Sequence, residues 1–192
     1  NPMLGGARPI ASFQCDSGPA LPVTAPTRLS THPALNEGDA TNADSPRPVS
    51  ISMRRGSFYL NNRVFGAMQD VPEENVVKLG STEVWEFAND ASMGMGMGMG
   101  MGGMMQMAHP MHVHNVQFKV LSRTRKGEQS ELHQHLSNGF TDYGLKDVVL
   151  VLPGERVKVL MKFENHTGIY LYHCHILEHE DLGMMQNYRV EA

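Results

Sequence analysis

The stretch that most limits the fold of this chain is Tyr172–Met185, which reads YHCHILEHEDLGMM. It brings histidine, cysteine and methionine side chains close together along the chain. Imidazole, thiolate and thioether groups are the soft or borderline ligands that bind copper. The fold therefore has to place these side chains where they can coordinate a metal ion.

Alternation along a strand divides this stretch into two faces. Successive side chains of a β-strand point to opposite sides of the sheet. If 172–175 is a strand, Cys174 points to one side, whereas His173 and His175 point to the other. The three adjacent residues therefore cannot serve one metal site together.

A second segment, 109–114, reads HPMHVH and shows the same alternation. His112 and His114 share one face of the expected strand, and His109 points to the opposite face. Together the two segments predict two separate ligand sets. One set holds His109, Cys174, His179 and Met184, and the other holds His112, His114, His173 and His175.

The two sets differ in the chemistry that they predict. Two imidazoles, a cysteine thiolate and a weakly bound thioether make the blue-copper electron-transfer site. The other set offers four imidazoles, which also suit copper. Cys174 is joined through the backbone to His173 and His175. An electron that reaches the first set therefore has a short covalent route to the second.

Most of the remaining chain from residue 48 alternates as strands do. The expected strands are 49–53, 58–60, 64–65, 76–79, 82–87, 109–121, 145–152, 156–163, 168–175 and 186–190. Short strands separated by Gly, Pro and Asn turns predict an all-β sandwich or barrel. Pro153-Gly154 predicts a hairpin. The only helix we expect is a short one over 176–182. The polar segment 123–144, with His133 and His135, is expected to be a loop.

Two segments lack this periodicity. Residues 16–47 are rich in Pro, Ala, Ser, Thr, Asn and Asp, which indicates a linker. Residues 93–107 alternate methionine with glycine, which disfavours regular structure. Because thioethers favour Cu(I), this loop is expected either to capture Cu(I) or to be a flexible insertion. Its methionines are Met93, Met95, Met97, Met99, Met101, Met104, Met105 and Met107.

Charge and composition exclude several classes of protein. The net charge of −4 gives no basis for nucleic-acid binding. No apolar run approaches the roughly 20 residues that a membrane span needs. Two cysteines, Cys15 and Cys174, are too few for a disulfide framework.

The two histidine-rich motifs resemble those of the C-terminal cupredoxin domain of multicopper oxidases. HPMHVH at 109–114 matches HPxHxH, and 173–184 matches HCHxxxHxxxGM at every position. The sequence HCHILEHEDLGMM at 173–185 is especially similar to that of the branch that contains spore-coat laccase, bilirubin oxidase and phenoxazinone synthase. The resemblance implies a cupredoxin-like Greek-key β-sandwich or barrel over 48–192. It also implies that 1–15 hold the last strand or strands of a preceding cupredoxin domain, and that 16–47 link the two domains.

The resemblance also implies roles by position. A type 1 copper would be bound by His109, Cys174 and His179, with Met184 as axial ligand; His112 would bind type 2 copper, and His114, His173 and His175 would bind type 3 copper. Glu180 looks like the acid that delivers protons during oxygen reduction.

The activity implied is that of a copper oxidase, either laccase-like or a cuprous oxidase linked to copper resistance. It would take single electrons from phenols, aromatic amines or Cu(I) and reduce O2 to water. The family's trinuclear centre takes eight histidines, half of them from an N-terminal domain. This chain would therefore need N-terminal cupredoxin domains, in the same chain or a nicked one. The resemblance also implies an extracytoplasmic location: periplasmic, secreted or on a spore or cell surface.

Two other functions use fewer of these residues. A single-domain blue-copper electron carrier needs one ligand set and leaves four histidines unexplained. A Cu(I)-binding module would use the methionine loop. Metal analysis with electron paramagnetic resonance (EPR) distinguishes the three.

Overall fold

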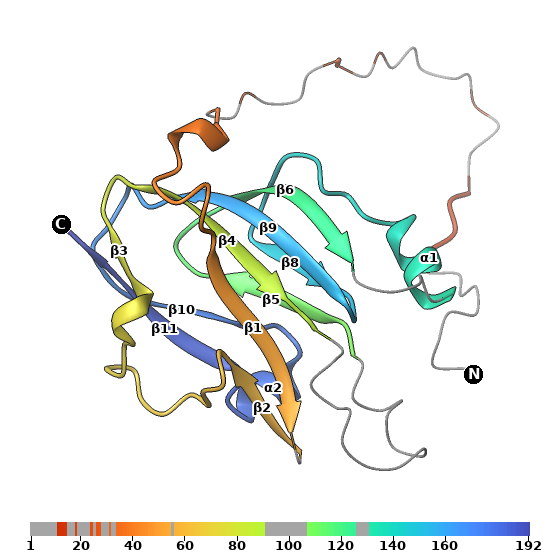
Figure 1. Cartoon of the computed structure of the whole chain (residues 1–192). Helices are drawn as coiled ribbons and strands as arrows, with labels where there is room; N and C mark the ends of the chain where they lie inside the picture. The colour runs from red at the N-terminus through yellow and green to blue at the C-terminus, as the bar shows by residue number, and fades with distance from the viewer. Residues whose placement is uncertain are drawn as a thin grey trace.

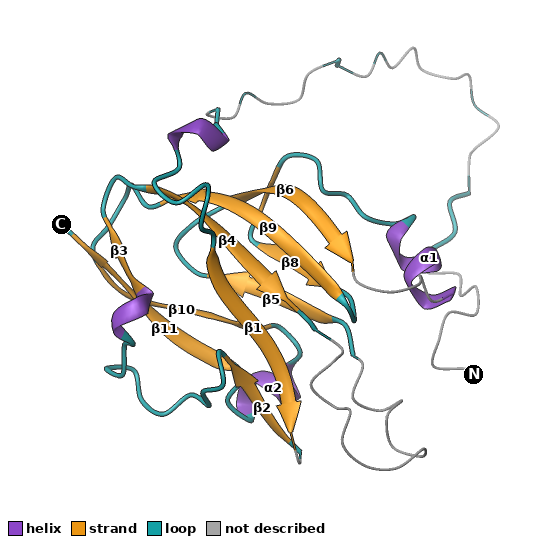
Figure 2. Cartoon of the chain, viewed as in Figure 1, coloured by secondary structure: helices purple, strands orange, loops and turns teal. Residues whose placement is uncertain are grey.

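Two β-sheets face each other across a shared core in this computed structural model (Figures 1 and 2). The structure describes residues 11–14, 18, 24, 26–27, 31, 34–54, 56–90, 107–125 and 131–192. One sheet has the order β2-β1-β4-β9-β6-β7 and the other β3-β11-β10-β5-β8. The all-β sandwich predicted from the sequence is confirmed.

The six-stranded sheet contains β1 (Arg47–Arg54), β2 (Ser57–Leu60), β4 (Thr82–Ala88), β6 (Phe118–Arg125), β7 (Leu145–Lys146) and β9 (Glu155–Lys162). The five-stranded sheet contains β3 (Val76–Lys78), β5 (His109–Val113), β8 (Val148–Val151), β10 (Gly168–Cys174) and β11 (Met185–Glu191). The helices are η1 (Glu37–Asp39), η2 (Glu73–Asn75), α1 (Glu131–Ser137) and α2 (Leu177–Asp181). The short helix expected after the HCH strand is α2. None of the described helices is long and apolar enough to cross a membrane.

The core between the sheets is built around Trp85, which is fully buried on β4. Its ring meets Tyr172 and Tyr188 edge-on, with centroid distances of 5.4 and 5.6 Å. Both tyrosines belong to the opposite sheet. Apolar burial of this kind is the main force that holds two sheets together, and here it fixes the position of β10, the strand that carries Cys174.

The predicted hairpin at Pro153-Gly154 is wrong. β8 pairs with β5 in one sheet, whereas β9 pairs with β4 and β6 in the other. The turn between them crosses the sandwich, and the buried Glu155 carboxylate accepts the Leu152 N–H at 2.9 Å inside it. Alternation alone cannot predict this, because a strand has the same period whichever sheet it joins.

Three further expectations are corrected. The expected strands 109–121 and 145–152 each divide into two strands that join different sheets: β5 and β6 in the first case, β7 and β8 in the second. Val64 and Phe65 do not form a strand, because the Phe65 N–H donates to the Gly183 carbonyl at 3.0 Å. The segment 123–144 is not simply a loop, since β6 extends to Arg125 and α1 contains His133 and His135.

The end of the predicted linker runs beside β4. Ala40 forms a parallel bridge with Thr82, and the Asn42 side chain bonds both backbone groups of Val84, at 2.7 and 3.0 Å. The division into 1–15, 16–47 and 48–192 stays a prediction. Cys15 and the methionine loop, apart from Met107, lie outside the described residues.

Candidate metal centre

The two histidine-rich segments form neighbouring antiparallel strands, β5 and β10. His173 pairs with His112, and Cys174 pairs with Met111. Cys174 and Met111 are fully buried, whereas His112 and His173 are only partly buried. The sheet therefore separates the candidate ligands as strand alternation predicts. We call the buried group His109, Cys174, His179 and Met184 the inner set, and the group His112, His114, His173 and His175 the outer set.

The two histidines of the inner set converge on the Cys174 sulfur. Its Sγ lies 3.5 Å from Nδ1 of His109 and 3.6 Å from Nδ1 of His179. All three side chains are buried, and their ligand atoms lie within 4.8 Å of one another. Met184 is also fully buried, and its backbone bonds both neighbours: its N–H donates to His179 O at 2.9 Å, and its carbonyl accepts the Cys174 N–H at 3.1 Å. The arrangement suits a single small ion at the sulfur.

Burial controls the protonation of the inner set. It lowers the pKa of His109 to about 4, and a positive charge on His179 would lower it further. Burial also lowers the pKa of His179 and raises that of the Cys174 thiol to about 11. Both imidazoles are therefore neutral at neutral pH and offer lone pairs. An ion that binds here has to displace the thiol proton, because the thiolate is the ligand.

The outer set forms a second cluster on the opposite face of the same strands. Ligand nitrogens of His112, His114 and His173 lie within 4.8 Å of one another, and Nε2 of His114 is 3.1 Å from Nε2 of His173. The His175 ring is more exposed, with its centroid 5.7 Å from that of His112 and 5.6 Å from that of His173. Four imidazoles thus face one another, as predicted.

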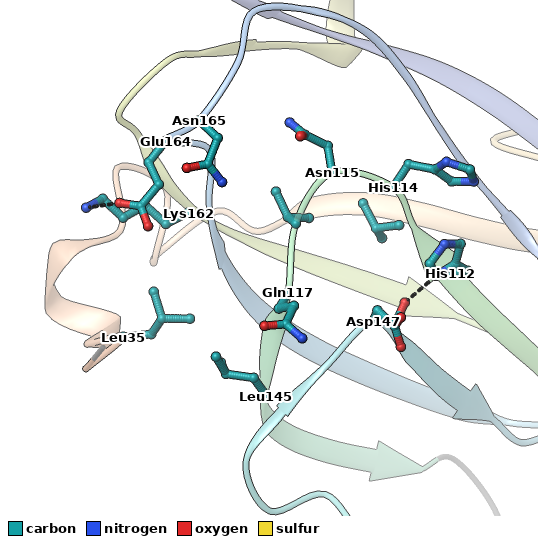
Figure 3. A pocket seen from close by; sticks show the side chains of 12 residues that line it. Leu35, His112, His114, Asn115, Gln117, Leu145, Asp147, Lys162, Glu164 and Asn165 are labelled. Carbon is teal, nitrogen blue, oxygen red and sulfur yellow. Dashed lines mark hydrogen bonds and ion pairs between the residues drawn. The ribbon is translucent and has the colours of Figure 1, made fainter. Parts of the chain in front are cut away.

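Backbone carbonyls set which nitrogen each ring presents. His112 Nδ1 is 2.7 Å from the Asp147 carbonyl, and His173 Nδ1 is 2.9 Å from the Cys174 carbonyl (Figure 3 shows the first of these). A carbonyl can only accept, so both Nδ1 atoms carry the proton and both Nε2 atoms carry a lone pair; that of His173 faces Nε2 of His114. Burial lowers the pKa of His114, and positive charge on the neighbouring histidines lowers it further. The role of the Asp147 carbonyl could not be inferred from the sequence, because any residue at that bend carries one.

A cavity of about 450 Å³ adjoins the outer set (Figure 3). His112 and His114 lie at one side of it, and the Lys162–Glu164 ion pair, 2.6 Å long, lies at the other. Its remaining lining includes Asn115 and further amide side chains. The outer set is thus bordered by a polar cavity, while the inner set is enclosed in the core.

Residues 37–192 match the family described as multicopper oxidase. The chain belongs to this family. Copper is the cofactor of multicopper oxidases, and a type 1 centre and a trinuclear centre are characteristic of the family. The inner donor set fits a type 1 copper because it combines one buried thiol with two neutral imidazoles. The outer set, with imidazoles alone, fits part of a trinuclear centre.

Named relatives agree with the family assignment. The chain is 35% identical to a laccase of Haloferax volcanii over 92% of its own length and 30% of the laccase. It is 41% identical to the multicopper oxidase mco of Staphylococcus haemolyticus, over 82% of this chain and 31% of that protein. The McoA multicopper oxidase structure from Aquifex aeolicus superposes with a TM-score of 0.62 at 31% identity, over 87% of this chain and 33% of that one. The chain thus spans about a third of the length of these oxidases.

The remaining predicted site residues lie nearby or outside the described chain. Glu180 is half-buried on α2, and its negative charge opposes the lowering of the His173 pKa that burial causes. Met107 is exposed beside β5, and the other loop methionines are not described. Sequence reasoning missed Phe58, whose ring stacks on His179. Strand alternation predicts that Phe58 points into the core, but the sequence does not show which residue its ring contacts across the sandwich.

Proposed function

We propose that this multicopper oxidase domain accepts single electrons at the inner set and passes them to the outer set, where O2 is reduced to water. The electron donors would be phenols, aromatic amines or Cu(I). One observation carries the proposal: Cys174 belongs to the inner set, while both of its neighbours in the chain belong to the outer set. The two sites are therefore covalently connected through one strand.

The proposed ligands follow the two sets. The inner set would hold type 1 copper, with Met184 as axial ligand; His112 would hold type 2 copper, and the other outer histidines type 3 copper. Bound copper supplies one-electron redox chemistry. The chain supplies the covalent path for electrons between the two sites. A second path is the hydrogen bond that His173 Nδ1–H donates to the Cys174 carbonyl.

The outer set is half of what the family's trinuclear centre needs, so we propose that N-terminal cupredoxin domains provide the rest. The exposed His175 and the cavity beside His112 leave this face accessible within the described structure. In this proposal residues 48–192 are the C-terminal domain, 16–47 link it to the preceding domain, and 1–15 contain that domain's last strand. We further propose an extracytoplasmic location and a part in copper resistance.

The decisive experiment measures bound copper, EPR and oxygen uptake on the protein together with its N-terminal domains. We expect a blue type 1 signal, a type 2 signal and reduction of O2 to water with an aromatic donor. A blue signal without oxygen uptake would instead identify an electron carrier. Bound Cu(I) without any blue signal would identify a Cu(I)-binding module.

Glu180 is proposed to deliver protons to the outer set. Glu180 lies on α2 and lines a second cavity together with Val64 and Leu182. Its negative charge also acts on His173 of the outer set, where it opposes the lowering of the pKa. Replacing Glu180 with Gln should slow oxygen reduction by about 100-fold, the lower range for loss of a general acid. Reduction of the type 1 copper in the absence of O2 should keep its rate. Stopped-flow and oxygen-electrode measurements separate the two steps.

The matched control is Glu178→Gln, which removes the same charge from an exposed site on the same helix. It should leave both rates unchanged. If Glu180→Gln turns over oxygen normally across the pH range, the proton-delivery role is wrong.

A further inference from the structure

We propose that the segment Phe58–Phe65, here called the clamp, positions His179 and shields it from water, and so sets the copper affinity and reduction potential of the inner set. The clamp has no ligand of its own. Its first residues, Phe58–Leu60, belong to β2 in the opposite sheet, and the rest follows that strand. The clamp contacts the segment 179–184, here called the ligand turn because it carries His179 and Met184. The inference rests on the proposed function in naming copper as the ion that His179 holds.

The first contact is an aromatic stack between Phe58 and His179. Their ring centroids are 4.1 Å apart, and the ring planes differ by 25°. Phe58 is 8% exposed and His179 4%, so the stack is closed to bulk water. Phe58 lies on β2, and in Figure 1 this strand lies in front of α2. The contact therefore joins the six-stranded sheet to the helix that follows β10.

His179 needs such support because of where it sits in the chain. It lies on α2, which is only five residues long. An isolated helix of this length is unstable in water and depends on packing against other elements. A ring with a free χ2 angle would turn its Nδ1 away from Cys174, to which the distance is 3.6 Å. A flat partner held against one face prevents that rotation.

The second contact fixes the end of the same ligand turn. The Phe65 N–H donates to the Gly183 carbonyl at 3.0 Å, directly before Met184. Gly183 has a φ of +92°, and a Cβ at this position would lie 2.4 Å from Cγ1 of Val64. The clamp and the ligand turn thus fit without room for any side chain at Gly183. One continuous segment closes over both the His179 and the Met184 ends of the turn.

The clamp is itself anchored to β1. The Asn61 side chain accepts the Ser50 N–H at 2.7 Å and donates to the Pro48 carbonyl at 3.0 Å. Asn61 and Asn62 adopt φ values of 50° and 61°, which asparagine tolerates better than most residues. The clamp is therefore rigidly placed, as a positioning element has to be.

The chemical consequence concerns the charge of the bound ion. An apolar cover lowers the local polarity and excludes water, which disfavours the more highly charged Cu(II) state relative to Cu(I). Removing the aromatic face should therefore lower the reduction potential of the type 1 copper. It should also weaken copper binding, because the imidazole is no longer held in its binding orientation.

The test compares Phe58→Leu with Phe163→Leu, a matched loss of one aromatic ring. Phe163 is fully buried, and its ring contacts are with Trp85 and Tyr188 rather than with a ligand. For Phe58→Leu we expect copper affinity to fall roughly 10- to 100-fold, the range for lost supporting contacts of a metal site. The reduction potential should fall as well. Phe163→Leu should change neither, and Phe58→Tyr, which keeps the flat ring, should stay close to wild type.

A copper-free measurement tests the stack itself. In the metal-free protein the Phe58 ring current should shift the His179 ring protons upfield, and Phe58→Leu but not Phe163→Leu should remove that shift in the NMR spectrum. The inference is overturned if the shift is absent in wild type, or if both leucine variants weaken copper binding equally. If the shift is present but wild type forms no blue copper site, the proposed function fails while the positioning of His179 stands.

Discussion

Cys174→Ser is expected to abolish the blue copper signal and to leave the sandwich folded. The sulfur is the point on which both inner imidazoles converge, at 3.5 and 3.6 Å. A serine hydroxyl in the same buried position is nearly isosteric, but it is a hard ligand that stays protonated near neutral pH. The charge-transfer absorption that depends on the thiolate therefore disappears. Electron transfer from an aromatic donor should fall by at least about 100-fold. Even the loss of a residue that only hydrogen-bonds a metal ligand lowers metal affinity or activity roughly 10- to 100-fold.

The control has to reproduce a buried hydroxyl without touching the site. Val159→Thr does so, because Val159 is fully buried on β9, in the sheet that carries no candidate ligand. Both variants should lose stability by about 1–3 kcal/mol, the cost of a buried hydroxyl without a partner. Visible absorption, EPR and thermal unfolding provide the measurements. Retention of the blue band in Cys174→Ser would show that the sulfur is not the copper ligand.

The separation of the two ligand sets could be predicted from the sequence because it depends on a local rule. Alternation along a strand holds for any sheet, so Cys174 had to point away from His173 and His175 once 172–175 was a strand. The motif spacing then brought His109 to the Cys174 side. The pairing of His173 with His112 confirms that arrangement.

Features that depend on tertiary contacts were not predictable in the same way. The crossing from β8 to β9 has the sequence signal of a hairpin, because no local signal says which sheet a strand joins. Helix α1 replaces an expected loop, since its sequence is polar and its attachment involves a tertiary contact, the 3.5 Å approach of His133 Nε2 to Glu155 Oε1. The stack of Phe58 on His179 likewise joins residues from the two halves of the sandwich. Residues that support a site from another element leave little trace in a single sequence.

His175→Gln is expected to separate the two sites functionally. His175 is the exposed member of the outer set, so its replacement should change stability by no more than about 0.5 kcal/mol. The inner set should keep its blue copper, because His175 and the inner ligands lie on opposite faces of the sheet. Oxygen reduction should fall by at least roughly 100-fold, because losing a ligand lowers activity no less than losing a residue that only hydrogen-bonds a ligand. Electrons would then accumulate at the type 1 copper.

The matched control is His166→Gln, the same substitution at an exposed histidine after β9. The measurement is made on the copper-loaded oxidase with its N-terminal domains, by following bleaching of the blue band and oxygen uptake together. A donor should bleach the His175 variant rapidly, and the colour should return slowly when O2 is added. In wild type and in the His166 variant the blue colour should return at once. If His175→Gln instead loses the blue band together with oxygen uptake, the two sets are not independent sites, and the division that β10 imposes between Cys174 and its neighbours does not govern the chemistry.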